Sequence, residues 1–172
     1  MTASARRFAL RARTAEAHAA LDASVGPFDS VAAYRRYLRG IHAFRAPVER
    51  ALVDLPGVPL PITALIEADM TAASVAPVLA RDFDLPGDPS ALAGILYVLQ
   101  GSALGARVLY PRARALGQAS AHLAAQAGDR PAWAAFCARL DAVEPFDAEA
   151  AAGGALATFG FALDAFRHAG DG

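Results

Sequence analysis

The segment Ser90–Leu109, with the sequence SALAGILYVLQGSALGARVL, constrains the fold more than any other stretch of the chain. Its apolar residues recur at intervals of three and four, a spacing that places them on one side of a helix. The preceding residues Asp88 and Pro89 are typical of a helix start, because aspartate caps free backbone N–H groups and proline presets a helical φ. The sequence therefore predicts a long apolar helix around which the rest of the chain is organised.

Three glycines lie inside this predicted helix: Gly94, Gly101 and Gly105. Each interior glycine disfavours a helix by about 1 kcal/mol relative to alanine, so a compensating reason is expected. Gly101 and Gly105 are four residues apart and share a face, where they leave two patches of bare backbone one turn apart. Two interpretations of this face are open. Either a neighbouring helix packs against it at short range, or a flat ligand lies against the backbone.

Strand patterns are nearly absent, and alanine, leucine and arginine dominate the sequence, which predicts an all-α fold. The chain is expected to form one domain, 1–172, built from about seven helices. Pro47 and Pro77 are expected to kink or divide the second and third helices, and Pro111 to bend or end the glycine-containing helix. The predicted helices span 4–23, 29–54, 62–82, 90–109, 118–127, 129–143 and 147–169.

The composition limits the classes of function. Hydrophobic residues make up 55% of the sequence, which is enough to bury a core, and the formal net charge of -1 gives no reason to expect nucleic-acid or charged-membrane binding. The single cysteine, Cys137, excludes an internal disulfide and suits a reducing compartment. The N-terminal region lacks the apolar stretch of a signal peptide, and no uninterrupted apolar run is long enough to span a bilayer. We therefore expect a cytoplasmic protein.

A second feature lies on the first predicted helix, where Arg11, Thr14 and His18 share one face. Arg11 and His18 are two turns, or roughly 10 Å, apart along the helix axis. A neutral imidazole is a good ligand for iron, and a guanidinium can pair with a carboxylate through two hydrogen bonds. These residues fit a flat ligand that has a metal at its centre and acidic groups at its edge. The alternative is a half-buried histidine beside a solvated arginine.

Three other histidines compete with His18 as a metal ligand. His42, on the second predicted helix, is the strongest competitor. His122 lies on a short helix with no evident partner, and His168 lies in the last turn of the last helix, where a cation suits the helix dipole. The sequence has no Glu-x-x-His pair and no cluster of cysteines or carboxylates, so it does not indicate a zinc or di-iron site. Cys137 has no evident base near it, which argues against a thiol nucleophile.

Together the two helices resemble the heme oxygenases, in particular bacterial ones linked to phytochromes. The motif LRxxTxxxHxxLD, which spans Leu10–Asp22, is similar to the proximal-helix motif of that family. The segment YVLQGSALGA, Tyr97–Ala106, is similar to its distal-helix motif, of which GSxLGG is a common bacterial form. The resemblance extends over the whole chain in length and helix order.

The resemblance implies an all-α fold that holds heme between the first helix and the glycine-containing helix. It implies that His18 is the axial ligand of the heme iron and that Arg11 contacts a heme propionate, with Thr14 among the heme-binding residues. In the family a second basic contact comes from the last helix, for which Arg167 is the candidate here.

On the distal side, the resemblance gives Gly101 and Gly105 the role of the glycines that lie over the heme, with Ser102 beside them. Many members of the family carry an aspartate at the position of Ser102, and Phe44 replaces a tyrosine of the second helix. Ala106 replaces the second glycine of the LGG pattern. These departures bear on rate and product pattern more than on heme binding.

The implied activity is cleavage of heme by O₂ to biliverdin, ferrous iron and carbon monoxide. Electrons are expected from an external protein such as a ferredoxin or a flavoprotein, and a phytochrome is a candidate receiver of the bilin. Two alternatives stay open. One is a heme carrier or sensor without turnover, which Ser102 and Phe44 favour. The other is a thiaminase-like helical enzyme without heme, which needs a well-placed cysteine and carboxylates that the sequence does not show.

Overall fold

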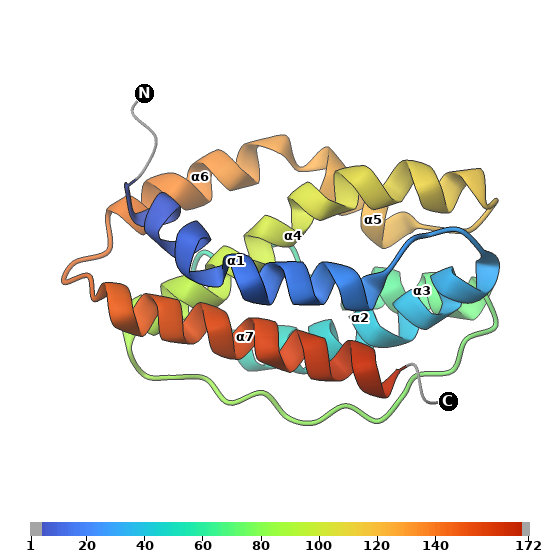
Figure 1. Ribbon diagram of the computed structural model, residues 1–172, viewed down its shortest axis with the longest axis horizontal. Coiled ribbons are helices and arrows are strands. Elements are labelled where there is room, and N and C mark those ends of the chain that lie inside the picture. The colour runs from blue at the N-terminus through green and yellow to red at the C-terminus, as the bar shows by residue number, and fades with distance from the viewer. Residues whose placement is uncertain (1–4, 170–172) are drawn as a thin grey trace.

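The computed structural model describes residues 5–169, and this part of the chain contains helices and no β-strand (Figure 1). The prediction of an all-α fold is confirmed. The helices of the described residues are α1 (Ala5–Val25), α2 (Val31–Leu52), α3 (Thr63–Ala72), α4 (Pro89–Ala115), α5 (Ala121–Gly128), α6 (Arg130–Asp141) and α7 (Ala148–His168).

Side-chain caps explain where several helices begin. Ser30 and Asp88 each accept a hydrogen bond from the backbone N–H three residues further on, at 3.1 and 2.8 Å, which starts α2 and α4. Asp147 caps α7 in the same way. Asp129 occupies the cap position of α6, but its side chain makes no capping hydrogen bond. Pro131 is the second residue of that helix and has no N–H to donate.

Two prolines disturb their helices less than the sequence predicts. α2 runs unbroken through Pro47, and α4 continues past Pro111 to its end at Ala115. Pro47 is buried in the core together with its helix neighbours Phe44 and Val48. Packing along the helix therefore outweighs the single hydrogen bond that the proline removes.

The third helix is shorter than predicted, and an irregular segment, 73–88, follows it. The helix closes where Ser74 adopts a left-handed φ of 54° and where the N–H groups of Ser74 and Val75 bond back to the last turn. Pro77 lies beyond this closure and keeps the residue before it out of the helical region. In Figure 1 the segment runs along the lower edge of the molecule, below α7.

α7 is the helix against which several of the other helices pack. It packs against α4, α1 and α2, while α4 also packs against α5 and α6. At the crossing of α4 and α7, a Cβ on Gly94 would lie 1.9 Å from the carbonyl oxygen of Ala151, and a Cβ on Gly154 would lie 2.1 Å from that of Ala91. No side chain fits at either position, so glycine is what allows the two backbones to touch.

Among the helices that the structure describes, α4 alone is long and apolar enough to cross a membrane by length and composition. Its inner face packs against α5 and α7 and buries Ile95, Val98 and Leu99. The apolar character of α4 is thus accounted for by its place in the helical core.

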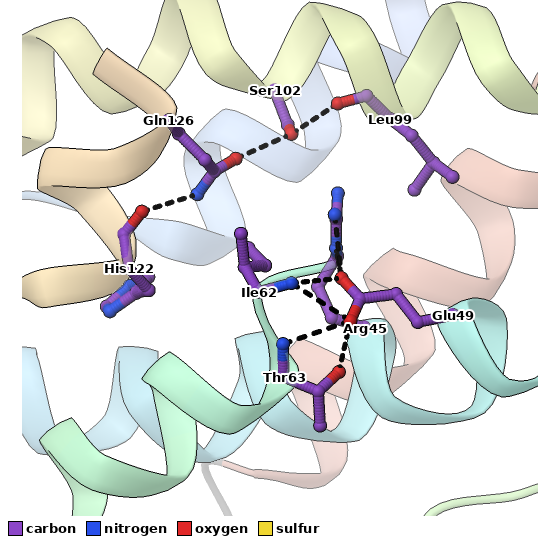
Figure 2. A network of polar contacts seen from close by, with 8 residues as sticks. All are labelled: Arg45, Glu49, Ile62, Thr63, Leu99, Ser102, His122 and Gln126. Carbon is purple, nitrogen blue, oxygen red and sulfur yellow. Dashed lines mark hydrogen bonds and ion pairs between the residues drawn. The ribbon is translucent and has the colours of Figure 1, made fainter. Parts of the chain in front are cut away.

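A buried ion pair joins α2 to the start of α3 (Figure 2). Arg45 is 2% exposed, and its Nη2 lies 2.7 Å from Oε1 of Glu49, one turn further along α2. The Glu49 carboxylate also accepts hydrogen bonds from the backbone N–H groups of Ile62 and Thr63 and from Oγ1 of Thr63. Because Ile62 at the cap position of α3 has no polar side chain, Glu49 caps that helix from another one.

Opposing effects act on the pKa of the Glu49 carboxyl group. Burial raises this pKa. The charge of Arg45 and the hydrogen bonds from Thr63 and Ile62 lower it, and together they outweigh burial, so the pKa lies below its usual 4.5. A carboxylate whose pKa is lowered by folding stabilises the folded state when the pH is above the pKa that the same group has in the unfolded chain. That contribution is lost as the pH falls through the folded pKa.

The crossing of α4 and α7 predicts opposite effects for two glycine substitutions. Gly94→Ala should lower the free energy of unfolding by about 2 kcal/mol, because the added methyl group forces the backbones apart. Gly153→Ala is the control, on the exposed side of α7 where a Cβ meets nothing within 4 Å. It should raise the free energy of unfolding by up to about 1 kcal/mol. Urea unfolding measures both, and a harmless Gly94→Ala would contradict the described crossing.

Glu49→Gln keeps the side-chain shape but leaves Arg45 buried without a counterion. We expect it to lower the free energy of unfolding at neutral pH by about 3 kcal/mol. As the pH falls below about 4.5, we also expect the free energy of unfolding of this variant to decrease less steeply than that of the wild type. The decrease that remains is due in part to Asp69, whose pKa is also lowered. Glu16→Gln, on the exposed face of α1, is the control and should change neither quantity. Identical acid slopes for Glu49→Gln and wild type, measured by urea unfolding across pH, would refute this account.

Candidate functional site

α1 and α4 run in the same direction over the first part of their length. Leu10 of α1 and Ala93 of α4 belong to one buried cluster. One turn further along each helix, Thr14 lies beside Tyr97. Burial raises the pKa of the Tyr97 phenol, and a hydrogen bond with Thr14 offsets part of that rise. α1 and α4 therefore approach each other at Thr14 and Tyr97.

His18 lies about one turn beyond Thr14 on α1, and Gly101 lies about one turn beyond Tyr97 on α4. The imidazole of His18 packs edge-on against Phe159 of α7, with ring centroids 5.7 Å apart. Phe159 shares a buried cluster with Val98, which precedes Gly101 by about one turn on α4. In Figure 1 the C-terminal half of α4 lies above α1. Phe159 of α7 therefore contacts His18 of α1 and lies in one buried cluster with Val98 of α4.

One of the two ring nitrogens of His18, Nδ1, has a polar partner in the protein. Nδ1 lies 3.0 Å from Oδ2 of Asp22, one turn further along α1, and the His18 side chain is 62% exposed. Within the described residues, Nε2 makes no hydrogen bond. Histidines that bind a metal commonly donate their other N–H to a carboxylate, which fixes the tautomer and the ring orientation. Asp22 takes that part here, so Nε2 is the nitrogen available to a metal.

The structure distinguishes the three glycines of α4 by what lies next to them. Gly94 is required at the crossing with α7. Among the described residues, a Cβ on Gly101 would approach a single ring carbon of α6, at 4.0 Å, and a Cβ on Gly105 would meet nothing within 4 Å. Close helix packing therefore explains Gly94 but not Gly101 or Gly105. Leu104 and Val108 extend the same face and are 40% and 53% exposed. An open apolar face with bare backbone suits a flat ligand.

Polar contacts from two helices hold Ser102. Its Oγ lies 2.6 Å from the carbonyl oxygen of Leu99 and 3.0 Å from Oε1 of Gln126. Gln126 in turn donates from Nε2 to the carbonyl oxygen of His122, and Figure 2 shows this chain of contacts from α5 to α4. A serine hydroxyl has one hydrogen, so it donates to one of the two oxygens at a time. Gln126 could not be predicted from the sequence, because its contact with Ser102 depends on how α5 packs against α4.

The polar residues predicted at the edge of the ligand differ in their exposure. Arg11 is exposed and lies near enough to Tyr97 for its charge to lower the Tyr97 pKa, against the larger effect of burial. Thr14 is buried, and its Oγ1 donates to the carbonyl oxygen of Leu10 at 2.8 Å. Arg167 lies exposed in the last turn of α7. Within residues 5–169 neither arginine forms an ion pair, so both charges are accessible to an acidic ligand.

His42 and His168 are placed differently from His18. His42 is buried, and its Nε2 lies 3.4 Å from Oε1 of Glu67, which directs it toward α3. His168 is exposed at the end of α7, where its Nδ1 lies 2.8 Å from the carbonyl oxygen of Asp164. Among the described residues, no three histidine, cysteine, aspartate or glutamate side chains gather in the way a metal site requires.

His122 has partners that the sequence did not indicate. It is fully buried, with Nδ1 2.6 Å from Oδ2 of Asp69 and Nε2 3.3 Å from the hydroxyl of Tyr37. Asp69 also accepts hydrogen bonds from the backbone N–H groups of Ala121 and His122, and so caps α5 from α3. The expectation that His122 lacks a partner is wrong, because α3 and α2 supply its partners from far away in the sequence.

The second-helix position singled out by the resemblance, Phe44, is buried and packs toward Phe161 of α7, with ring centroids 6.4 Å apart. Arg45, the next residue of α2, is polar, and its guanidinium group points toward α4 in Figure 2. Sequence reasoning missed Arg45 and Glu49. Their only signal is a spacing of four, which is also typical of exposed pairs.

Among known proteins, the chain matches solved structures but no family model and no curated protein. Among solved structures, the chain is similar to the heme oxygenase from Neisseria meningitidis in its NO- and CO-bound crystal structures, at 25% sequence identity and a TM-score of 0.74. The match covers 95% of this chain and 91% of that chain. The chain has the heme oxygenase fold.

Proposed function

We propose that this protein is a heme oxygenase that binds heme between α1 and α4. It cleaves heme with O₂ and electrons from an external donor to biliverdin, ferrous iron and carbon monoxide. The observation that carries the proposal is an exposed His18 on α1, together with a glycine face of α4 that helix packing leaves open. The similarity to a heme oxygenase over nearly the whole chain supports it.

The residues present fit heme as a ligand. His18 offers Nε2 to the iron while Asp22 holds Nδ1, and Phe159 restricts the orientation of the ring. Leu104 and Val108 provide exposed apolar surface on which the macrocycle can lie. When bound, heme supplies the chemistry of O₂ activation, and its own macrocycle is oxidised.

Gly101 and Gly105 determine how closely α4 can approach the macrocycle. Without a Cβ at these positions, the helix backbone can lie against the ligand and leave only a narrow space above it. A narrow space holds O₂ close to the macrocycle and excludes a second substrate. Ser102 lies on the flank of this face, where its hydroxyl is held by Leu99 and Gln126.

The two exposed arginines orient the acidic edge of heme in this proposal. Arg11 is two turns from His18, which suits a propionate that reaches away from the iron. Arg167 on α7 is the second propionate contact. Thr14 is buried beneath the same face, so we assign its contribution to holding Tyr97 in place along the wall of the site.

The proposed partners follow from the resemblance of the sequence. They are a ferredoxin or flavoprotein as electron donor and a phytochrome that receives the bilin, in the cytoplasm. A second candidate function is a heme carrier or sensor without turnover. One observation favours it: the Ser102 hydroxyl already has protein partners and carries no charge. The two functions differ in whether the heme complex consumes O₂ when a reductant is added.

His18 can be tested as the axial ligand in the heme complex. Ferric heme should bind at about one equivalent per chain, and His18→Ala should lose the absorption and electron paramagnetic resonance signature of an axial imidazole. Imidazole added to the solution should restore that signature. His168→Ala, which alters another exposed histidine, is the control and should keep it. If His42→Ala loses the signature and His18→Ala does not, the assignment is wrong.

Gly105 can be tested by comparing stability with turnover. Gly105→Ala should raise the free energy of unfolding of the heme-free protein by up to about 1 kcal/mol, because it removes a glycine from an open helix face. Gly105→Leu should bind heme but yield little biliverdin, because the side chain fills the space above the macrocycle. Ser102→Ala should have a milder effect, since a backbone carbonyl or water can replace the hydroxyl.

The loss of the heme absorption band and the bilin recovered by chromatography measure the turnover of these variants. Gly153→Leu, at an exposed glycine of α7 outside the site, is the matched control and should leave the yield unchanged. A wild-type biliverdin yield from Gly105→Leu would rule out the role assigned to the glycine face.

A further inference from the structure

A cavity of about 200 Å³ lies between α2, α7 and the irregular segment that follows α3. It is partly open to solvent and is lined by Ala43, residues 78–81, Phe161, Asp164, Ala165 and His168. The residues of α7 in this set recur at intervals of three and four, so they share one face of that helix. Phe159, which packs against His18, comes two residues before Phe161, and two residues turn a helix by about 200°. The cavity therefore lies on the side of α7 that faces away from His18.

The segment 73–88 spans this cavity without filling it. Val75 is buried near its start, and further along the ring of Phe83 packs edge-on against that of Phe161, with centroids 5.1 Å apart. Between these two attachments Leu79 is fully exposed, although it lines the cavity. Segments of this length without a helix or strand are uncommon in compact domains and are usually functional. The open space beneath the segment is therefore a candidate binding site.

The lining combines an apolar floor with a cation at the rim. Ala43, Phe161 and Ala165 supply the apolar surface. The guanidinium carbon of Arg81 lies 5.8 Å from the centre of the Phe161 ring, and its Nη2 lies 3.0 Å from Oδ2 of Asp164. A guanidinium group has five N–H donors, so among the described residues this ion pair leaves Nε and Nη1 for a further acceptor. An ionised acceptor such as a carboxylate forms the strongest hydrogen bonds with these donors.

A second polar group at the rim is His168. Its Nδ1 lies 2.8 Å from the carbonyl oxygen of Asp164, and within residues 5–169 its Nε2 makes no hydrogen bond. Because a carbonyl oxygen only accepts, Nδ1 carries the hydrogen of the neutral ring. Nε2 is then left to accept a hydrogen bond from a ligand or, once protonated, to donate one to it.

We propose that this cavity binds a small aromatic carboxylate, with its ring on Phe161 and its carboxylate on Arg81. An apolar cavity of about 150 Å³ can hold benzene, so a space of about 200 Å³ also has room for a short acidic substituent. Aromatic rings attract one another when they are offset or edge-on, and a carboxylate accepts charge-assisted hydrogen bonds from a guanidinium. The site does not involve heme, so it stands or falls separately from the proposed activity.

The test follows the backbone amide signals of the isotope-labelled full chain without heme by nuclear magnetic resonance, while phenylacetate is added. We expect saturable shifts in residues 78–81 and in the last two turns of α7. Phenylethanol has the same ring but no charge, and it should bind about tenfold more weakly. Arg81→Gln should weaken phenylacetate binding by about tenfold and leave phenylethanol binding unchanged, because it removes the carboxylate contact but not the apolar floor.

Ala165→Leu fills the cavity from α7 and should remove the shifts that phenylacetate causes. The same variant should still bind heme at the wild-type stoichiometry, because the cavity faces away from His18. Ala148→Leu, at the exposed start of α7, is the matched control and should bind phenylacetate like the wild type. If Ala165→Leu does not fold, Ala80→Leu narrows the same cavity from the segment.

Three results would overturn the proposal: no saturable shift in residues 78–81 of the wild type, a shift that persists in the folded, filled variant, or equal binding of the two probes. Shifts confined to α1 and α4 would place phenylacetate in the proposed heme site instead. Loss of heme binding in the filled variant alone would contradict the separation of the two sites. A wild-type chain that binds phenylacetate but not heme would refute the proposed function and leave the cavity assignment intact.

Discussion

The arrangement of the protein depends on the contact between the backbones of α4 and α7. Gly94 and Gly154 let the two helices touch, which fixes α4 on the helix that also supports α1 and α2. α1 and α4 meet directly where Thr14 lies beside Tyr97. Beyond that level, α7 positions both helices, so each can present a face to a ligand without loss of core packing. The candidate site is thus a consequence of the crossing.

The glycines of α4 serve two physical purposes in one helix. At Gly94 the missing side chain makes room for protein, and any larger residue would strike a carbonyl oxygen of α7. At Gly105 it leaves the backbone open, although alanine would suit the helix better. Both glycines lower the helix propensity of α4, but only at Gly94 does close packing with α7 compensate for this loss. The unexplained loss is the physical reason to place a ligand over Gly101 and Gly105.

Much of the fold could be predicted from local sequence because the signals are local. Asp88 caps α4 where the sequence indicates, and the helical spacing of apolar residues identifies α1, α2, α4 and α7. The extent of α3 could not be predicted, since its helical pattern continues past the turn at Ser74. The continuation of helices through Pro47 and Pro111 depends on packing, which single residues do not reveal.

The candidate site divides in the same way. His18 and the distal glycines belong to short motifs, so the sequence proposes them. The residues that hold those motifs in place come from distant helices: Glu49 caps α3, Asp69 caps α5, and Gln126 reaches Ser102. None of these contacts has a spacing signal, because each depends on the docking of one helix on another. Buried polar partners of this kind become visible only in three dimensions.

The central claim is that this protein cleaves the heme it binds, and the wild-type heme complex tests it most directly. The ferric complex would be given O₂ and a reductant, first ascorbate and then a ferredoxin with its reductase, with catalase present to remove free peroxide. The account predicts that the heme band disappears, that carbon monoxide is released, and that chromatography recovers biliverdin. A heme band that persists, or one that bleaches without any bilin product, would contradict the claim and leave a heme carrier on this fold.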